Sequence, residues 1–399
     1  MTAAAGPLGR PTLDALRQRT SLKWQLHPGD VLPLWVAEMD VEPADAVVVA
    51  VTDAMRAGDT GYPVGTSYAE ALRDFASDRW GFDGVDVGRT SLVPDVMVGL
   101  TEVLALLTAP GDAIVVNPPV YPPFYSFAEH SGRRVIEAPL DANFRLDLDA
   151  LDAAFAEARA GGRPAAYLMC SPHNPTGTVH TRAELELVAA LADKHGVRVV
   201  TDEIHGPLVL PGATFVPYLA VDDSAITLTS ASKAFNLAGF KAALAIAGPR
   251  AADDLARLPE VVLHGVSHFG VIAHTAALRG ARDWLDEVVV ALDANRALLD
   301  TLVAERLPGV SWQPPEATYL AWLDCRALGL SEGDESDPAA RGNVLSLAGP
   351  ALFFLEKARV ALSAGPAFGT GGDGHVRLNF ATSPAVLAEA IDRMASALA

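Results

Sequence analysis

Cysteine is scarce in this sequence. Its 399 residues contain only Cys170 and Cys325, and neither stands in a Cys-x-x-Cys pair or at the Cys/His spacing of a metal site. A disulfide framework is therefore excluded, no metal site is predicted, and a reducing compartment is the default expectation. Cys170 ends an apolar run and is typical of a small core residue.

Long apolar runs and basic charge are also lacking. No run of about 18 apolar residues occurs, and residues 1–11 hold no apolar signal-peptide segment, so we predict neither a membrane span nor a secretion signal. The chain has 30 Lys and Arg against 49 Asp and Glu, a net charge of −19, which argues against binding nucleic acid or an anionic membrane. We expect a cytoplasmic protein with a solvated acidic surface.

What is present is material for a large core, since half of the residues are hydrophobic. Between about residues 68 and 290, short apolar runs alternate with segments of helical periodicity, such as 146–159 and 183–195. The runs are 114–116, 165–170, 197–200, 225–229 and 243–247. This alternation predicts an α/β fold with a mainly parallel sheet between helices.

A long helix is predicted over residues 284–306, because this stretch has no internal Gly or Pro. It leads into a second part with mixed strands and helices. The acidic stretch 331–343, which contains Gly and Pro, predicts an exposed loop. No internal repeat is found.

Three polar segments follow predicted strands, at the sheet edge where ligands bind in such folds. Lys233 ends the segment 229–233 among small hydroxyl residues, and a partly buried lysine can act as a nucleophilic amine. Asp202 ends the strand before Glu203-Ile204-His205, and such a carboxylate can pair with a cofactor ring nitrogen. Asn174 lies in the turn 171–177 and can donate an amide N–H. Taken singly, each segment is also compatible with an ordinary surface loop.

The order of the three segments decides between these interpretations. Asn174 and Asp202 are 28 residues apart, and Asp202 and Lys233 are 31 apart, about one βα unit each. Together they give Asn-Pro-x-Gly, Asp-x-x-His and Ser-x-Ser-Lys. The chain thus resembles the fold type I pyridoxal-phosphate enzymes, the aminotransferase class I and II superfamily, over essentially its whole length.

A subgroup is indicated by the segment 32–40, Leu-Pro-Leu-Trp-Val-Ala-Glu-Met-Asp, which is similar to the N-terminal signature of the MalY/PatB group of cystathionine β-lyases and cysteine-S-conjugate β-lyases. Further matching segments are Lys23-Trp24, Gly61-Tyr62, 119–124, 171–177, 202–205, 232–239 and 376–380. The resemblance implies a large cofactor-binding domain over residues 49–290 with a seven-stranded type of sheet. It also implies a smaller α+β domain built from residues 1–48 and 291–399.

The resemblance also implies how the cofactor, pyridoxal 5′-phosphate, is held. Lys233 would form a Schiff base with it and then act as the base that removes the substrate α-proton. Asp202 would pair with the ring nitrogen, Asn174 would donate to the ring oxygen, and His205 would support that end. Tyr121 would stack on the ring face.

The cofactor phosphate is expected to bind backbone N–H groups of Val96 and Met97, before a helix. The loop lacks the Ser-Gly-Thr hydroxyls usual in the superfamily, and Ser230 is expected to add one. Lys241 stands where many relatives have an arginine, so a single ammonium contact or a bridging water is expected. Tyr62 resembles the tyrosine that reaches the phosphate from a neighbouring subunit, which implies a homodimer with shared active sites.

For the substrate, Arg377 matches the arginine that binds the α-carboxylate through two bonds, next to Asn174. The backbone near Ala37 is expected to cover that carboxylate, and Trp35 either shapes the pocket or packs in the core.

The implied reaction is α,β-elimination from L-cystathionine or a related cysteine S-conjugate, giving pyruvate, ammonia and a thiol. An aminotransferase would use the same lysine, so the three segments alone leave that alternative open, although the segment 35–40 favours the lyase. A regulatory protein on an enzyme fold is a second alternative.

Overall fold

A seven-stranded sheet forms the larger part of the molecule in the computed structural model, which describes residues 6–330 and 341–399. The strand order is β2-β8-β7-β6-β5-β3-β4. Strand β8 runs antiparallel to both of its neighbours, β2 and β7, and the other neighbouring pairs are parallel. The strands are β2 Thr90–Val93, β3 Ala113–Val116, β4 Arg134–Glu137, β5 Ala165–Cys170, β6 Arg198–Asp202, β7 Ile226–Thr229 and β8 Ala243–Ala247.

The central strands are buried on both faces, which is why they are continuous apolar runs rather than alternating ones. In β5, Leu168 and Cys170 pack into one core cluster, while Tyr167 and Met169 pack into another on the opposite face. Side chains alternate between the faces of a strand, so an unbroken apolar run supplies both cores.

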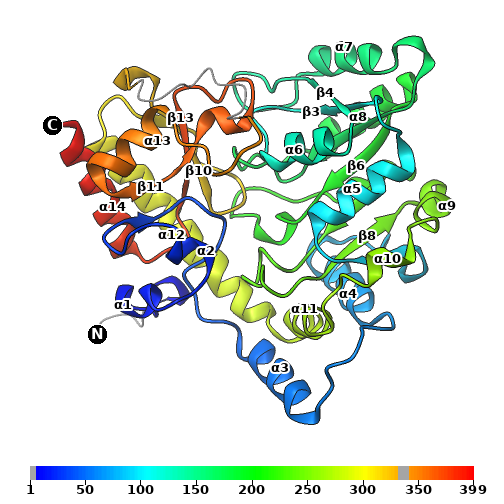
Figure 1. Cartoon of the computed structure of the whole chain (residues 1–399), viewed down its shortest axis with the longest axis horizontal. Helices are drawn as coiled ribbons and strands as arrows, with labels where there is room; N and C mark the ends of the chain where they lie inside the picture. The colour runs from blue at the N-terminus through cyan, green and yellow to red at the C-terminus, as the bar shows by residue number, and fades with distance from the viewer. Residues whose placement is uncertain (1–5, 331–340) are drawn as a thin grey trace.

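Helices cover the two faces. The helices α5 Val96–Leu107, α6 Pro123–His130 and α9 Ala252–Leu255 lie on one face, and α7 Leu148–Ala158 and α8 Arg182–His195 lie on the other (Figure 1). Helix α8 begins with a capping box, in which Thr181 and Glu184 bond each other's backbone N–H groups, and it ends at left-handed Gly196.

A second sheet forms beyond the long helix α12 Arg282–Arg306, with the strand order β12-β13-β10-β9. Its strands are β9 Ser311–Trp312, β10 Leu320–Asp324, β12 Ser363–Ala364 and β13 His375–Asn379. Beside them lie α13 Gly349–Phe353 and α14 Pro384–Leu398, and α14 packs on α12. The two-residue strand β1 Leu32–Pro33 pairs with β11 Val360–Ala361, so the two ends of the chain meet here (Figure 1).

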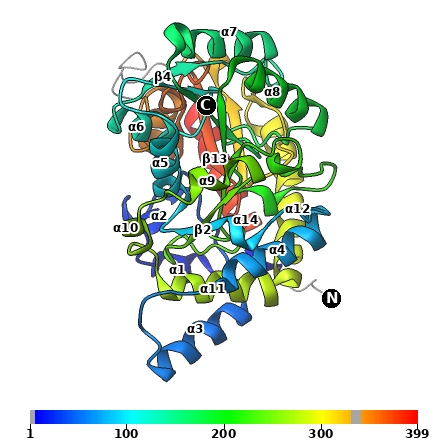
Figure 2. The same cartoon turned by 90° about the vertical axis from the view of Figure 1, so that its right-hand side faces the viewer.

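The remaining helices are α1 Leu13–Arg17, α2 Leu22–Gln25, α3 Asp45–Ala57, α4 Ser67–Trp80, α10 Glu260–Leu263 and α11 His268–Gly280. Helix α11 packs against α3 and α4. Both views show α3 projecting from the rest of the molecule (Figures 1 and 2).

The predicted α/β class with a mainly parallel seven-stranded sheet is confirmed. The runs 165–170 and 243–247 coincide with β5 and β8, while the edge strands β2 and β4 were not predicted. The predicted loop 331–343 falls largely outside the described residues. Among the helices in the described part of the chain, none has both the length and the apolarity needed to cross a membrane.

Candidate active site

A cavity of about 140 Å³ opens where strands β5, β6 and β7 end. The three polar segments singled out in the sequence meet there because the carboxyl ends of parallel strands lie at one edge of the sheet. Ten of the predicted site residues line this cavity: Ala37, Val96, Met97, Tyr121, Asn174, Asp202, His205, Ser230, Lys233 and Lys241. Arg377, Trp35 and Tyr62 are not among its lining residues.

Lys233 is half-buried, and its Nζ donates to the Ala37 carbonyl oxygen at 3.0 Å. Burial, with the nearby Arg377 charge, lowers the pKa of Lys233 to about 8. About a tenth of the lysine is therefore uncharged at pH 7, and an uncharged amine is the form that acts as a nucleophile or a base.

Asp202 is 4% exposed and faces the cavity. Its Oδ1 accepts from the Ile204 backbone N–H at 3.1 Å, and burial raises the pKa of Asp202 to about 6. A carboxylate desolvated in this way is stabilised by any cationic or N–H partner that enters the cavity.

Arg377, on β13, joins the second sheet to the cavity. Its Nη1 donates to Asn174 Oδ1 at 3.0 Å, and its Nη2 donates to the Trp35 carbonyl at 2.9 Å and to Ser363 Oγ at 3.2 Å. Its Nε is buried with no hydrogen-bond partner in the described part of the chain, and burial lowers the pKa of Arg377 to about 10. Because Asn174 accepts through its oxygen, its NH₂ end is the part of the amide available to donate elsewhere.

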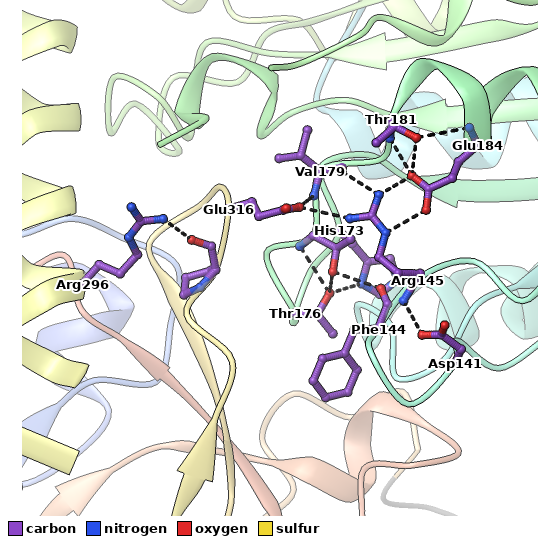
Figure 3. A network of polar contacts seen from close by, with 12 residues as sticks. Asp141, Phe144, Arg145, His173, Thr176, Val179, Thr181, Glu184, Arg296 and Glu316 are labelled. Atoms are coloured by element: carbon purple, nitrogen blue, oxygen red, sulfur yellow. Dashed lines mark hydrogen bonds and ion pairs between the residues drawn. The ribbon is translucent and has the colours of Figure 1, made fainter. Parts of the chain in front are cut away.

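The loop that carries Asn174 is held on its outer side by an ion-pair network (Figure 3). Arg145 pairs with Glu184 and with Glu316, and Glu316 Oε2 also accepts from the Val179 N–H at 2.7 Å. The Gly177 carbonyl accepts from the backbone N–H groups of Glu316 and Ala317.

Gly177 is required at this contact. It has a φ of +71°, and a Cβ there would lie 2.2 Å from Pro315. On its inner side the loop is fixed through His173, whose ring nitrogens contact Thr176 Oγ1 at 3.1 Å and the Asn117 carbonyl at 3.2 Å.

His205 and Tyr121 contribute ring surfaces to the cavity. His205 Nδ1 is buried and has no hydrogen-bond partner within residues 6–330 and 341–399, and burial lowers the pKa of His205 to about 3, so the ring is neutral. The ring of His205 meets that of Tyr319 edge-on, with centroids 6.3 Å apart. Tyr121 is half-buried at the wall, where burial raises its pKa to about 12.

The N-terminus of α5 points at the cavity through Val96 and Met97. Asp95 caps this helix, since its Oδ1 accepts from the Val98 N–H at 2.8 Å, and its Oδ2 forms an ion pair with Lys241 Nζ at 2.7 Å. The sequence did not single out Asp95, although an acidic residue directly before a helix is a recognisable cap signal. Ser230 Oγ donates to the Ala242 carbonyl at 2.8 Å, so its proton is already engaged.

Tyr62 and Trp35 lie apart from the cavity. Tyr62 is 86% exposed, with its ring centroid 6.4 Å from that of His264. The Trp35 side chain packs in a small cluster with Val31 and Ala361, and it is the Trp35 carbonyl that contacts Arg377. Among the described residues, no group of three or more His, Cys, Asp or Glu is placed to hold a metal ion.

Comparison with known proteins gives concordant matches. The family model for aminotransferase class I and II matches residues 30–394. A protein of Mycobacterium leprae (strain TN) named "Putative cystathionine beta-lyase" is 57% identical over 399 residues, covering 99% of this chain and 98% of the relative. The cystathionine beta-lyase of Corynebacterium glutamicum is 37% identical over 396 residues, covering 97% of this chain and 99% of the relative.

Among solved structures, one from Corynebacterium diphtheriae, described as a "putative plp-dependent beta-cystathionase", superimposes with a TM-score of 0.86. It is 36% identical to this chain, and the match covers 97% of this chain and 98% of the other.

Proposed function

We propose that this chain, which belongs to the aminotransferase class I and II family, is a pyridoxal-phosphate-dependent carbon–sulfur β-lyase. Its substrate is L-cystathionine or a related cysteine S-conjugate. The observation that carries the proposal is the meeting of Lys233, Asp202 and Asn174 in one cavity, with Arg377 bonded to Asn174. The names of the relatives described above support the same chemistry.

The donor set of the cavity fits pyridoxal phosphate. Asp202 is a desolvated carboxylate that needs a positive partner, and the ring nitrogen of the cofactor is one. The Asn174 amide supplies an N–H for the ring oxygen, and the Tyr121 ring supplies a face for stacking. Lys233 supplies the amine that attaches the cofactor.

Few groups of the cavity are placed to bind the phosphate of the cofactor. The first N–H groups of α5 have no acceptor within the helix, so Val96 and Met97 can bind a phosphate oxygen there. Lys241 adds positive charge but shares it with Asp95. Ser230 contributes only if its hydroxyl turns away from the Ala242 carbonyl.

When bound, pyridoxal phosphate supplies the electron sink that stabilises negative charge at the substrate α-carbon. Lys233 removes the α-proton through Nζ, and its pKa near 8 suits proton transfer at neutral pH. Arg377 and Asn174 hold the substrate α-carboxylate. The Ala37 carbonyl receives the lysine amine whenever that amine is not attached to the cofactor.

Over the whole reaction the bond between the β-carbon and sulfur breaks, and the sulfur leaves as a thiol. One water is consumed as the remaining three carbons become pyruvate and the nitrogen leaves as ammonia. The His205 ring is neutral, so it contributes to the cavity wall without adding a charge.

A homodimer is part of the proposal. The exposed Tyr62 lies outside its own cavity, and large apolar side chains stand exposed on and beside α3, namely Val48, Val49, Met55 and Val64. Such surfaces are typical of a contact with another protein chain. We place a second copy there, with Tyr62 reaching the partner's phosphate site. We also propose a cytoplasmic location, supported by the two free, buried thiols of Cys170 and Cys325.

The deciding experiment measures products from L-cystathionine without any keto-acid acceptor. We expect pyruvate and thiol in equal amounts, and none from Lys233→Ala. The wild type loaded with pyridoxal phosphate should also show an absorption band near the visible edge that Lys233→Ala lacks. Lys194→Ala, which changes an exposed lysine paired with Asp152, is the matched control and should retain both signals.

Turnover that appears only after a keto acid is added would make the protein an aminotransferase. A panel of cysteine S-conjugates, scored for pyruvate and thiol, then ranks the substrates.

A further inference from the structure

Residues 35–40, which we call the N-terminal strap, reach the cavity wall at Ala37 and are held by side-chain hydrogen bonds. Asn379 donates to the carbonyl oxygens of Val36 and Glu38, both at 2.7 Å. Asn236 accepts from the Met39 N–H at 2.8 Å and donates to the Met39 carbonyl at 2.9 Å. The Ala37 carbonyl, which lies between these anchor points, is therefore held in one place.

Two donors share the Ala37 carbonyl oxygen. Lys233 Nζ and Tyr319 Oη each donate to it at 3.0 Å. Tyr319 is fully buried directly before β10, and its own carbonyl accepts from the Phe380 N–H at 2.9 Å. The tyrosine is therefore held in place, and its hydroxyl donates to the same oxygen as the reactive lysine.

We propose that Tyr319 is a positioning residue for Lys233, which it controls through the Ala37 carbonyl. By donating to this oxygen, the tyrosine fixes it and makes it a weaker acceptor for the lysine ammonium, so the ammonium gives up its proton more readily. The proposal rests on the proposed function in one respect, that Lys233 is the base of the reaction.

The physical reason is the orientation of the tyrosine dipole. A carbonyl oxygen accepts two hydrogen bonds, and the positive end of the Tyr319 O–H dipole lies at the oxygen that would otherwise stabilise the ammonium alone. Burial raises the pKa of Tyr319, so its hydroxyl stays protonated and keeps donating.

Other groups face Lys233 from every side. Glu38 of the strap and Asp202 of β6 favour the ammonium, whereas Arg377 of β13 and Lys241 oppose it. His205 is neutral, and the field of Lys233 contributes to lowering its pKa. With these charges opposed in sign, a neutral dipole at the shared oxygen can shift the balance.

The test compares wild type with Tyr319→Phe, as full-length protein freed of cofactor. Competitive acetylation at several pH values, read by mass spectrometry on the peptide containing Lys233, gives the pKa of that amine. We expect the pKa to rise by about half a unit to one unit, the shift expected from one neutral hydrogen bond. The exposed Lys194 is the internal reference and should not change.

Tyr218→Phe is the matched control, because Tyr218 is also fully buried but its hydroxyl has no hydrogen-bond partner among the described residues. It should leave the pKa of Lys233 unchanged. Tyr319→Met, which also lacks the donor, must reproduce the rise and serves if the phenylalanine variant does not fold. An unchanged pKa of Lys233 in a folded Tyr319 variant overturns the proposal.

A second measurement separates this proposal from the proposed function. In protein loaded with pyridoxal phosphate, substrate frees the Lys233 amine from the cofactor, so the acid limb of the kcat profile for pyruvate release should move to higher pH in Tyr319→Phe. A shifted pKa in the cofactor-free protein without any pyruvate release supports the role of Tyr319 and refutes the lyase. Pyruvate release with no shift in either measurement supports the lyase and refutes the role of Tyr319.

Discussion

Two adjacent carboxyl groups, Asp202 and Glu203, leave β6 toward opposite faces of the sheet. Asp202 faces the cavity, whereas Glu203 Oε1 accepts from the Tyr218 N–H at 2.7 Å and from Thr201 Oγ1 at 3.3 Å. Burial raises the pKa of Glu203 to about 8, above that of Asp202. One carboxyl group is thus available to a ligand, while the other is neutral at pH 7 and part of the fold.

We predict that Glu203→Gln changes how stability depends on pH. The glutamine oxygen can still accept both bonds. In the wild type the folded state holds a proton on Glu203 that the unfolded state has lost, between the ordinary pKa of 4.5 and about 8. The wild-type free energy of unfolding therefore falls as pH rises through this range, and the variant lacks this contribution.

Urea unfolding at pH 5, 6.5 and 8 would measure the effect. The stability gained by Glu203→Gln should grow with pH, while Glu186→Gln, at an exposed residue paired with Arg182, should show no such trend. Parallel curves for wild type and Glu203→Gln would contradict the assignment of a neutral Glu203.

At the scale of elements, the loop between β5 and α8 joins the two sheets. Arg145 and Glu316 hold it from outside, and Arg296 of α12 fixes the neighbouring Pro315 carbonyl at 2.7 Å (Figure 3). Asn174 lies inside the same loop and accepts from Arg377. The position of Asn174 and Arg377, the proposed substrate-binding pair, therefore depends on contacts outside the cavity.

We predict that Glu316→Ala raises KM about three- to tenfold with little change in kcat, because it leaves the Val179 N–H without its acceptor and loosens the loop around Asn174. Glu316→Gln should recover part of the loss, since its amide oxygen can accept from Val179. Steady-state pyruvate kinetics measure both. Glu186→Ala, on the exposed side of α8, is the control, and an equal change in KM there would point to a general loss of stability.

Sequence patterns predicted the central strands well because burial on both faces leaves a continuous apolar run, as in β5. They missed the short edge strands such as β4, whose burial is mixed. They also singled out Lys233 and Asp202 by residue type and spacing, and both line one cavity in the structure. They did not find Tyr319, because its contact with Ala37 joins residues 282 apart, and no local pattern marks a shared backbone oxygen.

At the scale of the whole molecule, the proposed second copy of the chain would cover the projecting helix α3 and place the exposed Tyr62 in an interface (Figure 1). Large apolar side chains on such a projection are costly in water unless they are covered. In the proposed dimer a single active site draws on two subunits, so activity would depend on assembly.

This dependence predicts complementation between two inactive variants. Tyr62→Ala lacks the contact across the interface and Lys233→Ala lacks the base, but a mixed dimer contains one complete site. After subunits exchange at equal amounts, half of the dimers are mixed, so we expect up to about a quarter of wild-type pyruvate release. The control mixes Lys233→Ala with Lys233→Arg in the same way, and this mixture should stay inactive. If Tyr62→Ala and Lys233→Ala together recover no activity, shared sites are refuted.

Because the second sheet is built from the C-terminal part of the chain, the parts of the site are synthesised in a fixed order. Asp202 and Lys233 leave the ribosome well before β13, which supplies Arg377 and the Asn379 anchor of the strap. A nascent chain thus contains the groups proposed to hold a cofactor ring before Arg377, the proposed carboxylate anchor, has been made. Under the proposed function, a chain that ends before β13 lacks this anchor even when the cofactor-binding groups are present.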